Sequence, residues 1–150
     1  MDDLGRVREL GRRERGLAVV VTQRSDGSPH ASVVNAGVLD HPVTSEPVVA
    51  FAARGVVRKL ANLRMWPHLT VVFRSSWEWT AVEGNVDLAG PDDRLVGFDP
   101  SGLPRLLREI YAAAAGGTAD DWAELDEVTA AERHTAVLIR PARIYSNPGE

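Results

Sequence analysis

The 150-residue sequence contains no cysteine. This absence excludes disulfide frameworks, thiolate metal sites, iron–sulfur clusters and cysteine nucleophiles. Histidine is scarce as well, and the four residues, His30, His41, His68 and His134, have no HxxxH or HExxH spacing. We therefore expect no metal site, because zinc ligands usually occur in such local patterns. Any chemistry must rely on histidine, carboxylate or hydroxyl groups, or on a bound cofactor.

Long apolar runs are also missing. No stretch approaches the roughly 18 apolar residues that a membrane span needs, so we expect no membrane partner. The first 15 residues hold five arginines and no apolar segment of the kind found in secretory signals. We therefore expect a cytoplasmic protein. The length corresponds to one domain, covering residues 1–150.

Acidic residues are unevenly distributed. The net charge of -4 and a pI near 5.6 argue against a general nucleic-acid-binding protein. No acidic residue lies between Glu46 and Glu78, however, and this window should carry a positive potential. Its basic residues are Arg54, Arg58, Lys59, Arg64 and Arg74. Of the 17 basic residues in the chain, Lys59 is the sole lysine.

Common catalytic motifs are absent too. The sequence has no GxSxG elbow, no Walker A motif and no GxGxxG after a strand. The carboxylates of the acidic segment 92–133 read as a solvated helix face rather than as an acid–base pair. We assign no catalytic side chain. Such a sequence is typical of enzymes whose chemistry belongs to a bound cofactor.

The apolar pattern predicts strands first and helices late. Leu4, Val7 and Leu10 predict a short N-terminal helix, and a second helix is expected over 55–65, ending before Pro67. Six strands are expected at 17–22, 29–39, 48–53, 69–73, 77–88 and 135–145. The Asp26-Gly27 dipeptide predicts a hairpin between the first two strands. In the fifth strand the apolar phase changes, which indicates a bulge or bend.

Two further helices are expected before the last strand. One covers 103–114, with Ser101 as its N-cap and Gly116-Gly117 beyond its end. The other opens with a capping box formed by Thr118 and Asp121. The fold class is therefore mainly β with helices, an α+β domain built on an antiparallel sheet.

Several motifs occur in an order that resembles a known family. They are the segment 25–34, Arg58-Lys59-x-x-Asn62-Leu63-x-x-x-Pro67, Trp77-x-Trp79-x-x-Val82-Glu83-Gly84, Asp121-Trp122 and Pro141-x-x-Ile144-Tyr145. Together they resemble the flavin/deazaflavin-binding split β-barrel family, in particular the coenzyme F420-dependent enzymes related to pyridoxamine 5'-phosphate oxidase. The resemblance implies a six-stranded antiparallel split β-barrel. It also implies a homodimer with one cofactor in each of two grooves between the subunits.

The same resemblance implies cofactor-binding residues. The backbone of the second strand would lie along the ring system, the end of the third strand would contact the ribityl chain, and a lysine would hold the phosphate. These positions correspond to Ser32, Val33 and Val34, to Ala52, Ala53 and Arg54, and to Lys59. Trp77 and Trp79 would lie near the cofactor, and Asn62 is a further candidate. Some relatives carry an arginine where Val57 stands, whereas here Arg58 is next to the lysine.

Each residue also has a structural alternative. Lys59 could be an ordinary surface lysine, and the Ser32 hydroxyl could bond within the sheet. The two tryptophans could serve core or interface packing, and Asn62 could be a surface or capping residue.

The expected function is that of an F420-dependent oxidoreductase. Hydride would pass from reduced deazaflavin to an electron-poor unsaturated small molecule, with the proton available from solvent. The alternatives are an FMN-dependent enzyme of the pyridoxamine 5'-phosphate oxidase type and a flavin- or F420-binding carrier without turnover.

Overall fold

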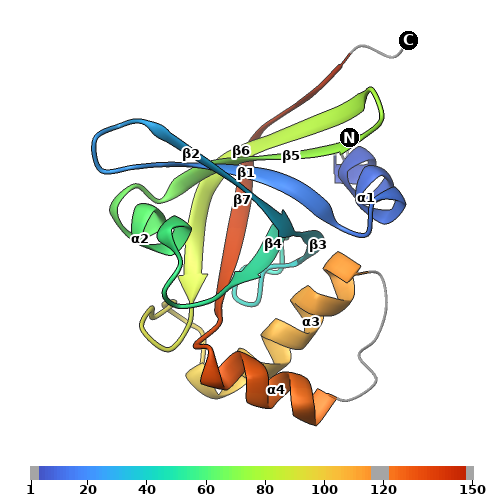
Figure 1. Ribbon diagram of the computed structural model, residues 1–150. Helices are drawn as coiled ribbons and strands as arrows, with labels where there is room; N and C mark the ends of the chain where they lie inside the picture. The colour runs from blue at the N-terminus through green and yellow to red at the C-terminus, as the bar shows by residue number, and fades with distance from the viewer. Residues whose placement is uncertain (1–3, 116–121, 148–150) are drawn as a thin grey trace.

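The computed structural model describes residues 4–115 and 122–147. In chain order the elements are α1 (Leu4–Arg13), β1 (Leu17–Gln23), β2 (Pro29–Asn35), β3 (Gly37–Asp40), β4 (Pro47–Ala53), α2 (Arg58–Met65), β5 (His68–Ser75), β6 (Glu78–Ala89), a 3-10 turn (Pro100–Gly102), α3 (Leu103–Ala115), α4 (Trp122–Ala131) and β7 (Thr135–Ser146). The prediction of a mixed fold dominated by antiparallel sheet is confirmed (Figure 1).

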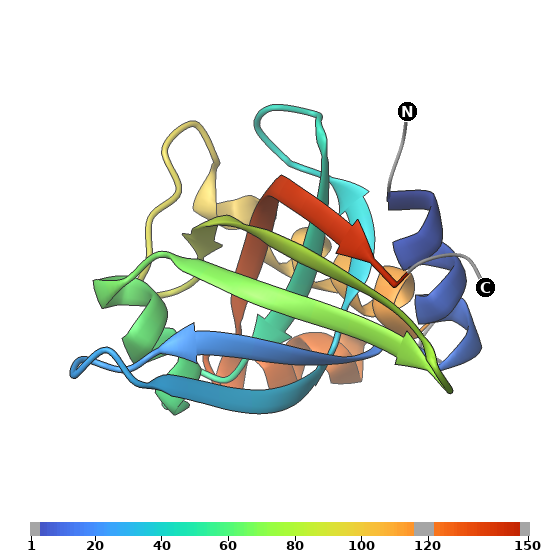
Figure 2. The same ribbon diagram turned by 90° about the horizontal axis from the view of Figure 1, so that it is seen from above.

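The sheet has seven strands in the order β2-β1-β5-β6-β7-β4-β3, and all neighbours are antiparallel. It bends strongly but does not close, because β2 and β3 remain as edges (Figures 1 and 2). The prediction of six strands is wrong. The expected strand 29–39 is two strands, since β2 pairs with β1 whereas β3 pairs with β4.

The break between β2 and β3 falls at Ala36. Its backbone N–H donates to the Gly16 carbonyl (N···O 2.8 Å). At this residue the chain leaves β2, at one end of the strand order, and enters β3, at the other end. Gly37 follows immediately against α3, where an added Cβ would lie 2.5 Å from the Ala113 carbonyl carbon. This position therefore requires glycine, because a side chain would push the helix away.

The bulge predicted for the fifth strand is confirmed. The pairing of β6 with β7 shifts between Glu83 and Gly84, so that Ala142 of β7 is left over. A Cβ on Gly84 would lie 1.9 Å from the Arg140 carbonyl oxygen, so only glycine fits. The adjacent Pro141 is tolerated because a bulge removes the need for its N–H. Because of this bend, the pair of β6 and β7 joins the half of the sheet that contains β5 to the half that contains β4.

Strand β4 and the first half of β7, residues 135–139, are buried on both faces, and this explains their continuous apolar sequences. Phe51 and Ile139 belong to the main core, inside the bent sheet. Ala50 and Leu138 point the other way, into a second core under α3. Strand β4 thus packs into both cores, and its last residues line the cavity described below.

The helices cover different parts of the sheet. Helices α1 and α2 lie at opposite ends of it, whereas α3 and α4 pack together below it (Figures 1 and 2). Among the helices that the structure describes, none is long and apolar enough to cross a membrane.

The start of the third helix differs from the prediction. Ser101 is not an N-cap, because it lies within the 3-10 turn that precedes α3. Asp99 caps this turn instead, its carboxylate accepting from the Ser101 N–H (N···O 2.9 Å). An acidic side chain is as good a cap as serine, so the sequence alone did not separate the two. The expected caps at Gly116-Gly117, Thr118 and Asp121 lie outside the described residues.

Candidate functional site

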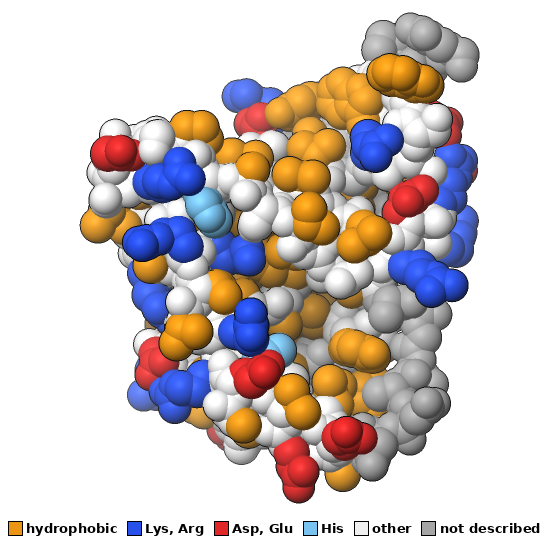
Figure 3. Space-filling model, in the orientation of Figure 1, with side chains coloured by type: hydrophobic (Ala, Val, Ile, Leu, Met, Phe, Trp, Pro, Cys, Tyr) orange, Lys and Arg blue, Asp and Glu red, His pale blue; other side chains and the backbone are white. Residues whose placement is uncertain are grey.

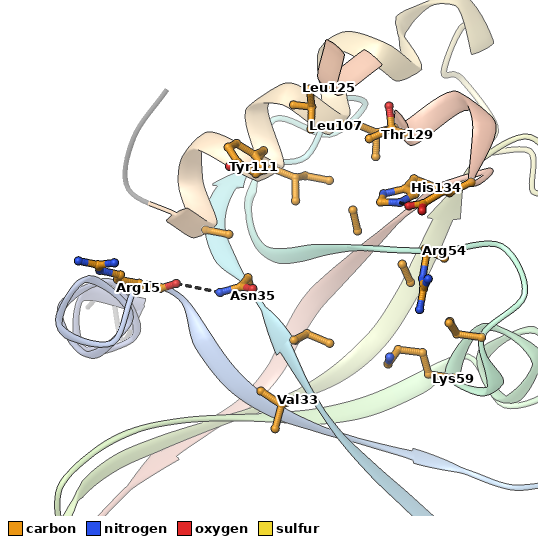
Figure 4. Close-up of a pocket in the computed structure, with 17 residues that line it drawn as sticks. Arg15, Val33, Asn35, Arg54, Lys59, Leu107, Tyr111, Leu125, Thr129 and His134 are labelled. Carbon is orange, nitrogen blue, oxygen red and sulfur yellow. Dashed lines mark hydrogen bonds and ion pairs between the residues drawn. The ribbon is translucent and has the colours of Figure 1, made fainter. Parts of the chain in front are cut away.

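A cavity of about 820 Å³ lies between the sheet and the pair α3 and α4 (Figures 3 and 4). In the space-filling view it is a hollow with apolar side chains inside and basic side chains beside it (Figure 3). The ends of β2 and β4 and the start of α2 line one side of the cavity, and α3 and α4 line the other side. The lining residues are Arg15, Val33, Val34, Asn35, Ala52, Ala53, Arg54, Val57, Lys59, Leu107, Ile110, Tyr111, Ala114, Leu125, Thr129, Glu132 and His134.

One end of the cavity is cationic. Arg54 directly follows β4, and Lys59 lies in the first turn of α2 (Figure 4). Burial lowers the pKa of Lys59, and the positive charge of Arg54 lowers that pKa further. Within the described chain, no ion pair neutralises either side chain. The N-cap residue Val57 offers no side-chain acceptor, so no side chain caps the N–H groups of Arg58 and Lys59, whereas the Leu60 N–H donates to the Val57 carbonyl (3.2 Å).

Nearby arginines behave differently. Arg64 pairs with Asp93 (N···O 2.7 Å), and Arg133 pairs with Asp92. These aspartates come from the loop after β6, and neither of them lines the cavity. The cationic end is therefore a local surplus of positive charge, the arrangement that binds anions.

The opposite side of the cavity is apolar. Leu107, Ile110, Tyr111 and Ala114 of α3 line it together with Leu125 of α4. The four residues of α3 recur at helical spacing, so they lie on one face of that helix.

Contacts of α3 hold α4 in place. The Tyr111 and Trp122 rings meet edge to face with centroids 6.3 Å apart. Arg108 forms an ion pair with Asp126 and also lies 5.9 Å over the Trp122 ring. The helical side of the cavity is thus formed by two helices that pack against each other.

A histidine and a glutamate lie beside the cationic end. The His134 Nε2 is 2.9 Å from Glu132 Oε1. The turn that carries them is fixed by the His134 N–H, which donates to the Thr129 carbonyl (2.8 Å), and by the Gly55 N–H, which donates to the Glu132 carbonyl (3.2 Å). The sequence analysis missed this pair, because His134 has no ligand-like spacing to the other histidines. Its proximity to a carboxylate two residues away was the available signal.

Six of the eleven residues proposed from the sequence line this cavity. They are Val33, Val34, Ala52, Ala53, Arg54 and Lys59. They come from β2, β4 and α2, three elements separated in the sequence, and the fold brings them to one place (Figure 4).

Three other proposed residues lie nearby but do not line it. The Ser32 hydroxyl is buried and has no hydrogen-bond partner among the residues described. Arg58 is exposed to solvent. Asn62 is buried, and its side-chain amide donates to the Thr22 hydroxyl (N···O 3.0 Å), which ties α2 to β1. Asn62 is therefore neither a surface residue nor a capping residue.

The two tryptophans lie at the other end of the sheet. Trp77 is 89% exposed in the turn between β5 and β6, and this turn is next to α1, as the ion pair of Glu78 with Arg13 shows. Trp79 packs edge to face against Tyr145 with centroids 6.0 Å apart. Neither side chain lines the cavity of its own chain. In the part of the chain that the structure describes, no cluster of three or more histidine or acidic side chains could hold a metal ion.

The sequence matches no protein-family model and none of the curated proteins compared with it. Solved structures do resemble the fold. A conserved hypothetical protein of Mycobacterium tuberculosis is 16% identical, with a TM-score of 0.67 over 92% of this chain and 81% of the other.

Two further solved structures carry informative names. A pyridoxamine 5'-phosphate oxidase-related, FMN-binding protein from Nostoc punctiforme is 15% identical, with a TM-score of 0.63 over 96% of this chain and 78% of the other. A protein named F420 reductase is 19% identical, with a TM-score of 0.51 over 86% of this chain and 88% of the other. At these identities the likeness establishes the fold, which is that of the pyridoxamine 5'-phosphate oxidase-like proteins.

Proposed function

We propose that this protein is an oxidoreductase that uses coenzyme F420, with FMN as the second candidate. The observation that carries the proposal is the cationic end of the cavity, where Arg54 and Lys59 meet the first turn of α2 without a carboxylate partner in the described chain. A phosphate bound there would gain two charge-assisted contacts and the field of a helix N-terminus.

The residues present fit a flavin or deazaflavin. Either group combines a flat ring system with a phosphate on a flexible chain, and when bound it supplies hydride transfer to or from a substrate. Arg54 and Lys59 would hold the phosphate, and the small side chains of Ala52 and Ala53 would leave room for the flexible chain. The backbone of β2 would lie along the ring, because an edge strand has N–H and C=O groups that no neighbouring strand uses.

The ion pairs of two arginines in β7 favour an F420-dependent enzyme over an oxidase of the pyridoxamine phosphate type. A phosphorylated substrate would need its own cationic site near the last strand. Arg140 there pairs with Asp87 (N···O 3.2 Å), and Arg143 pairs with Glu83 (3.4 Å), so acidic partners already offset both charges. FMN remains the second candidate because the Nostoc relative is described as FMN-binding.

We expect the functional unit to be a homodimer. Leu17, Val19 and Val33 are 48%, 41% and 64% exposed, and the pairing of Val19 with Val33 places them on one outer face of β1 and β2. Such a patch is typical of an interface. A second copy on this face would bury about 2,000 Å² or more, as in obligate dimers. In a dimer, the exposed Trp77 of one copy could also approach the site of the other.

Titration of the purified protein with F420 and, separately, with FMN tests the proposal through cofactor fluorescence. We expect saturable F420 binding, followed by turnover with enones or quinones as acceptors. FMN binding without F420 binding would favour the second candidate, and F420 binding without turnover would favour a carrier. Failure to bind either cofactor would contradict the proposal. Sedimentation showing only a 16.3 kDa species with cofactor bound would contradict the dimer.

A further inference from the structure

The N-terminal segment 4–15 carries charges of both signs, and its glutamates are already engaged. Glu9 forms an ion pair with Arg13, and the Arg13 side chain also pairs with Glu78 of β6. Glu14 accepts a hydrogen bond from the Ser75 hydroxyl of β5 (O···O 2.9 Å). These contacts tie the end of α1 to the β5–β6 hairpin, and they involve only one of the arginines near that end.

Other arginines of this segment border a second hollow, which we call the α1–α3 groove. It has a volume of about 450 Å³ and lies between α1, the end of α3 and the start of β3. Within residues 4–115 and 122–147, the guanidinium groups of Arg12 and Arg15 form no hydrogen bond or ion pair. None of the described residues that line the groove is acidic, so its edge carries a local surplus of positive charge. The lining residues are Val7, Arg8, Gly11, Arg12, Arg15, Ala36, Gly37, Val38, Ala113 and Ala114.

The backbone fixes the place of Arg15. Its φ of 53° lies in the left-handed region, which at the end of a helix is usually occupied by glycine or asparagine. The Arg15 carbonyl accepts from the Asn35 side-chain amide (N···O 3.0 Å), and the next N–H, of Gly16, donates to the Gly11 carbonyl (2.7 Å). Figure 4 shows Arg15 on the far side of the cavity from Lys59, with its side chain directed away from Lys59. Neighbouring contacts thus hold an arginine in an unfavourable conformation, which is a feature that clusters at functional sites.

The rest of the groove lining is apolar and mostly small. Val7, Ala36, Val38 and Ala114 contribute hydrocarbon surface between the arginines. A hydrocarbon chain gains affinity by covering such surface, and a guanidinium group binds a carboxylate through parallel hydrogen bonds. A bare inorganic anion would leave the apolar lining uncovered, and a neutral hydrocarbon would leave the guanidinium groups without a partner. The combination fits a molecule that carries both an anionic group and an apolar chain.

We propose that the α1–α3 groove binds an amphipathic organic acid, whose carboxylate contacts Arg12 and Arg15 and whose aliphatic chain lies against Val38 and Ala114. This site is separate from the cationic end of the cavity, which Arg54 and Lys59 form on other elements. The inference stands on the groove and its unpaired arginines, and it does not depend on the proposed function.

Two probes of equal chain length test the site by calorimetry. Octanoate carries the carboxylate, and octan-1-ol is its uncharged counterpart; both are titrated into the purified protein without added cofactor. The wild type should bind octanoate saturably and more tightly than octan-1-ol. Arg12→Gln and Arg15→Asn should each weaken octanoate binding roughly threefold to tenfold, as expected for a charge-assisted contact at an exposed position. Asparagine is chosen at position 15 because it tolerates the left-handed conformation.

Matched controls are available in the chain. Arg13 follows Arg12 on α1 but is paired and does not line the groove, so Arg13→Gln should change octanoate affinity by less than about twofold. Lys59→Ala removes a cation from the cavity and should likewise leave octanoate binding unchanged. If Arg15→Asn does not fold, as judged by circular dichroism, the exposed pair Arg12→Gln and Arg13→Gln still decides whether the groove holds the acid.

Several results would overturn the inference. Absence of octanoate binding, or octan-1-ol binding as tight as that of octanoate, would contradict the recognition of a carboxylate. Equal losses in Arg12→Gln and Arg13→Gln would assign the effect to the general charge of α1 instead of the groove. A loss in Lys59→Ala, with Arg12→Gln unchanged, would place the acid in the cavity. The expected pattern would support the groove site whether or not the protein binds F420 or FMN, so the two proposals can fail separately.

Discussion

Two groups of basic residues lie close together in this protein and differ in their partners. Arg64 and Arg133 pair with neighbouring aspartates of the loop after β6. Arg54 and Lys59 face a cavity and form no ion pair within the described chain. The chain has 21 acidic residues, so carboxylates are not in short supply. The paired arginines serve local structure, and the unpaired cations are the ones that we propose bind an anionic cofactor.

The largest effect should come from removing the unpaired lysine. Lys59→Ala eliminates a charge-assisted contact worth about 1.5–3 kcal/mol, so cofactor affinity should fall roughly tenfold to a hundredfold. The fold should be preserved, because alanine is a good helix former. Fluorescence titration measures the affinity. The wild type should also lose affinity as salt rises, with a steeper slope than the variant.

Arg58→Ala is the matched control for this prediction. Arg58 precedes Lys59 on the same helix but is exposed and outside the cavity. Its replacement should change cofactor affinity by less than about twofold, as expected for an exposed charge. Equal losses in the two variants would mean that general positive potential, rather than the cavity, attracts the cofactor.

A pH series should sharpen the same contrast. The pKa of Lys59 is lowered from 10.5, mainly by burial and further by Arg54, whereas a bound phosphate favours the protonated amine. Affinity should therefore be constant below the pKa of the free-protein lysine and fall as the pH rises above it, by up to about tenfold per pH unit. This decline should begin below the pH at which an ordinary lysine titrates. Lys59→Ala should lack it, and a decline of equal size in that variant would assign the titration to another group.

The smallest effect should come from breaking a paired arginine. The Arg64 side chain is partly exposed, and a pair of this kind contributes about 0.2–1 kcal/mol to folding. Arg64→Ala should lower the free energy of unfolding in urea by no more than that and leave cofactor affinity unchanged. A marked loss of affinity would show that the loop after β6 helps to form the site, and the distinction between the two groups would then fail.

The features predicted correctly from sequence depend on local patterns. The spacing of Leu4, Val7 and Leu10 reports a helix face, and the Asp26-Gly27 dipeptide reports a turn, whatever surrounds them. The phase change in β6 likewise follows from which side chains are buried. The division at Ala36 was missed because a strand that moves from one partner to another keeps its apolar composition.

The site was predictable only in part, for a related reason. The absence of acidic residues around Lys59 is visible in the sequence, and so is its position at the start of a helix. The sequence does not show that α3 and α4 fold over the ends of β2 and β4, and this packing is what makes His134 and Tyr111 neighbours of Lys59 in one cavity. In the same way, the position of Trp77 near α1 depends on the direction of the long β5–β6 hairpin.

The most direct test of the central claim is a crystal structure of the protein with F420 or FMN bound. The account predicts that the cofactor phosphate lies within hydrogen-bond distance, about 3 Å, of the Lys59 amine, beside Arg54 and the first turn of α2. A phosphate bound elsewhere, with the Lys59 amine in solvent, would contradict the claim that the unpaired cations form the cofactor site.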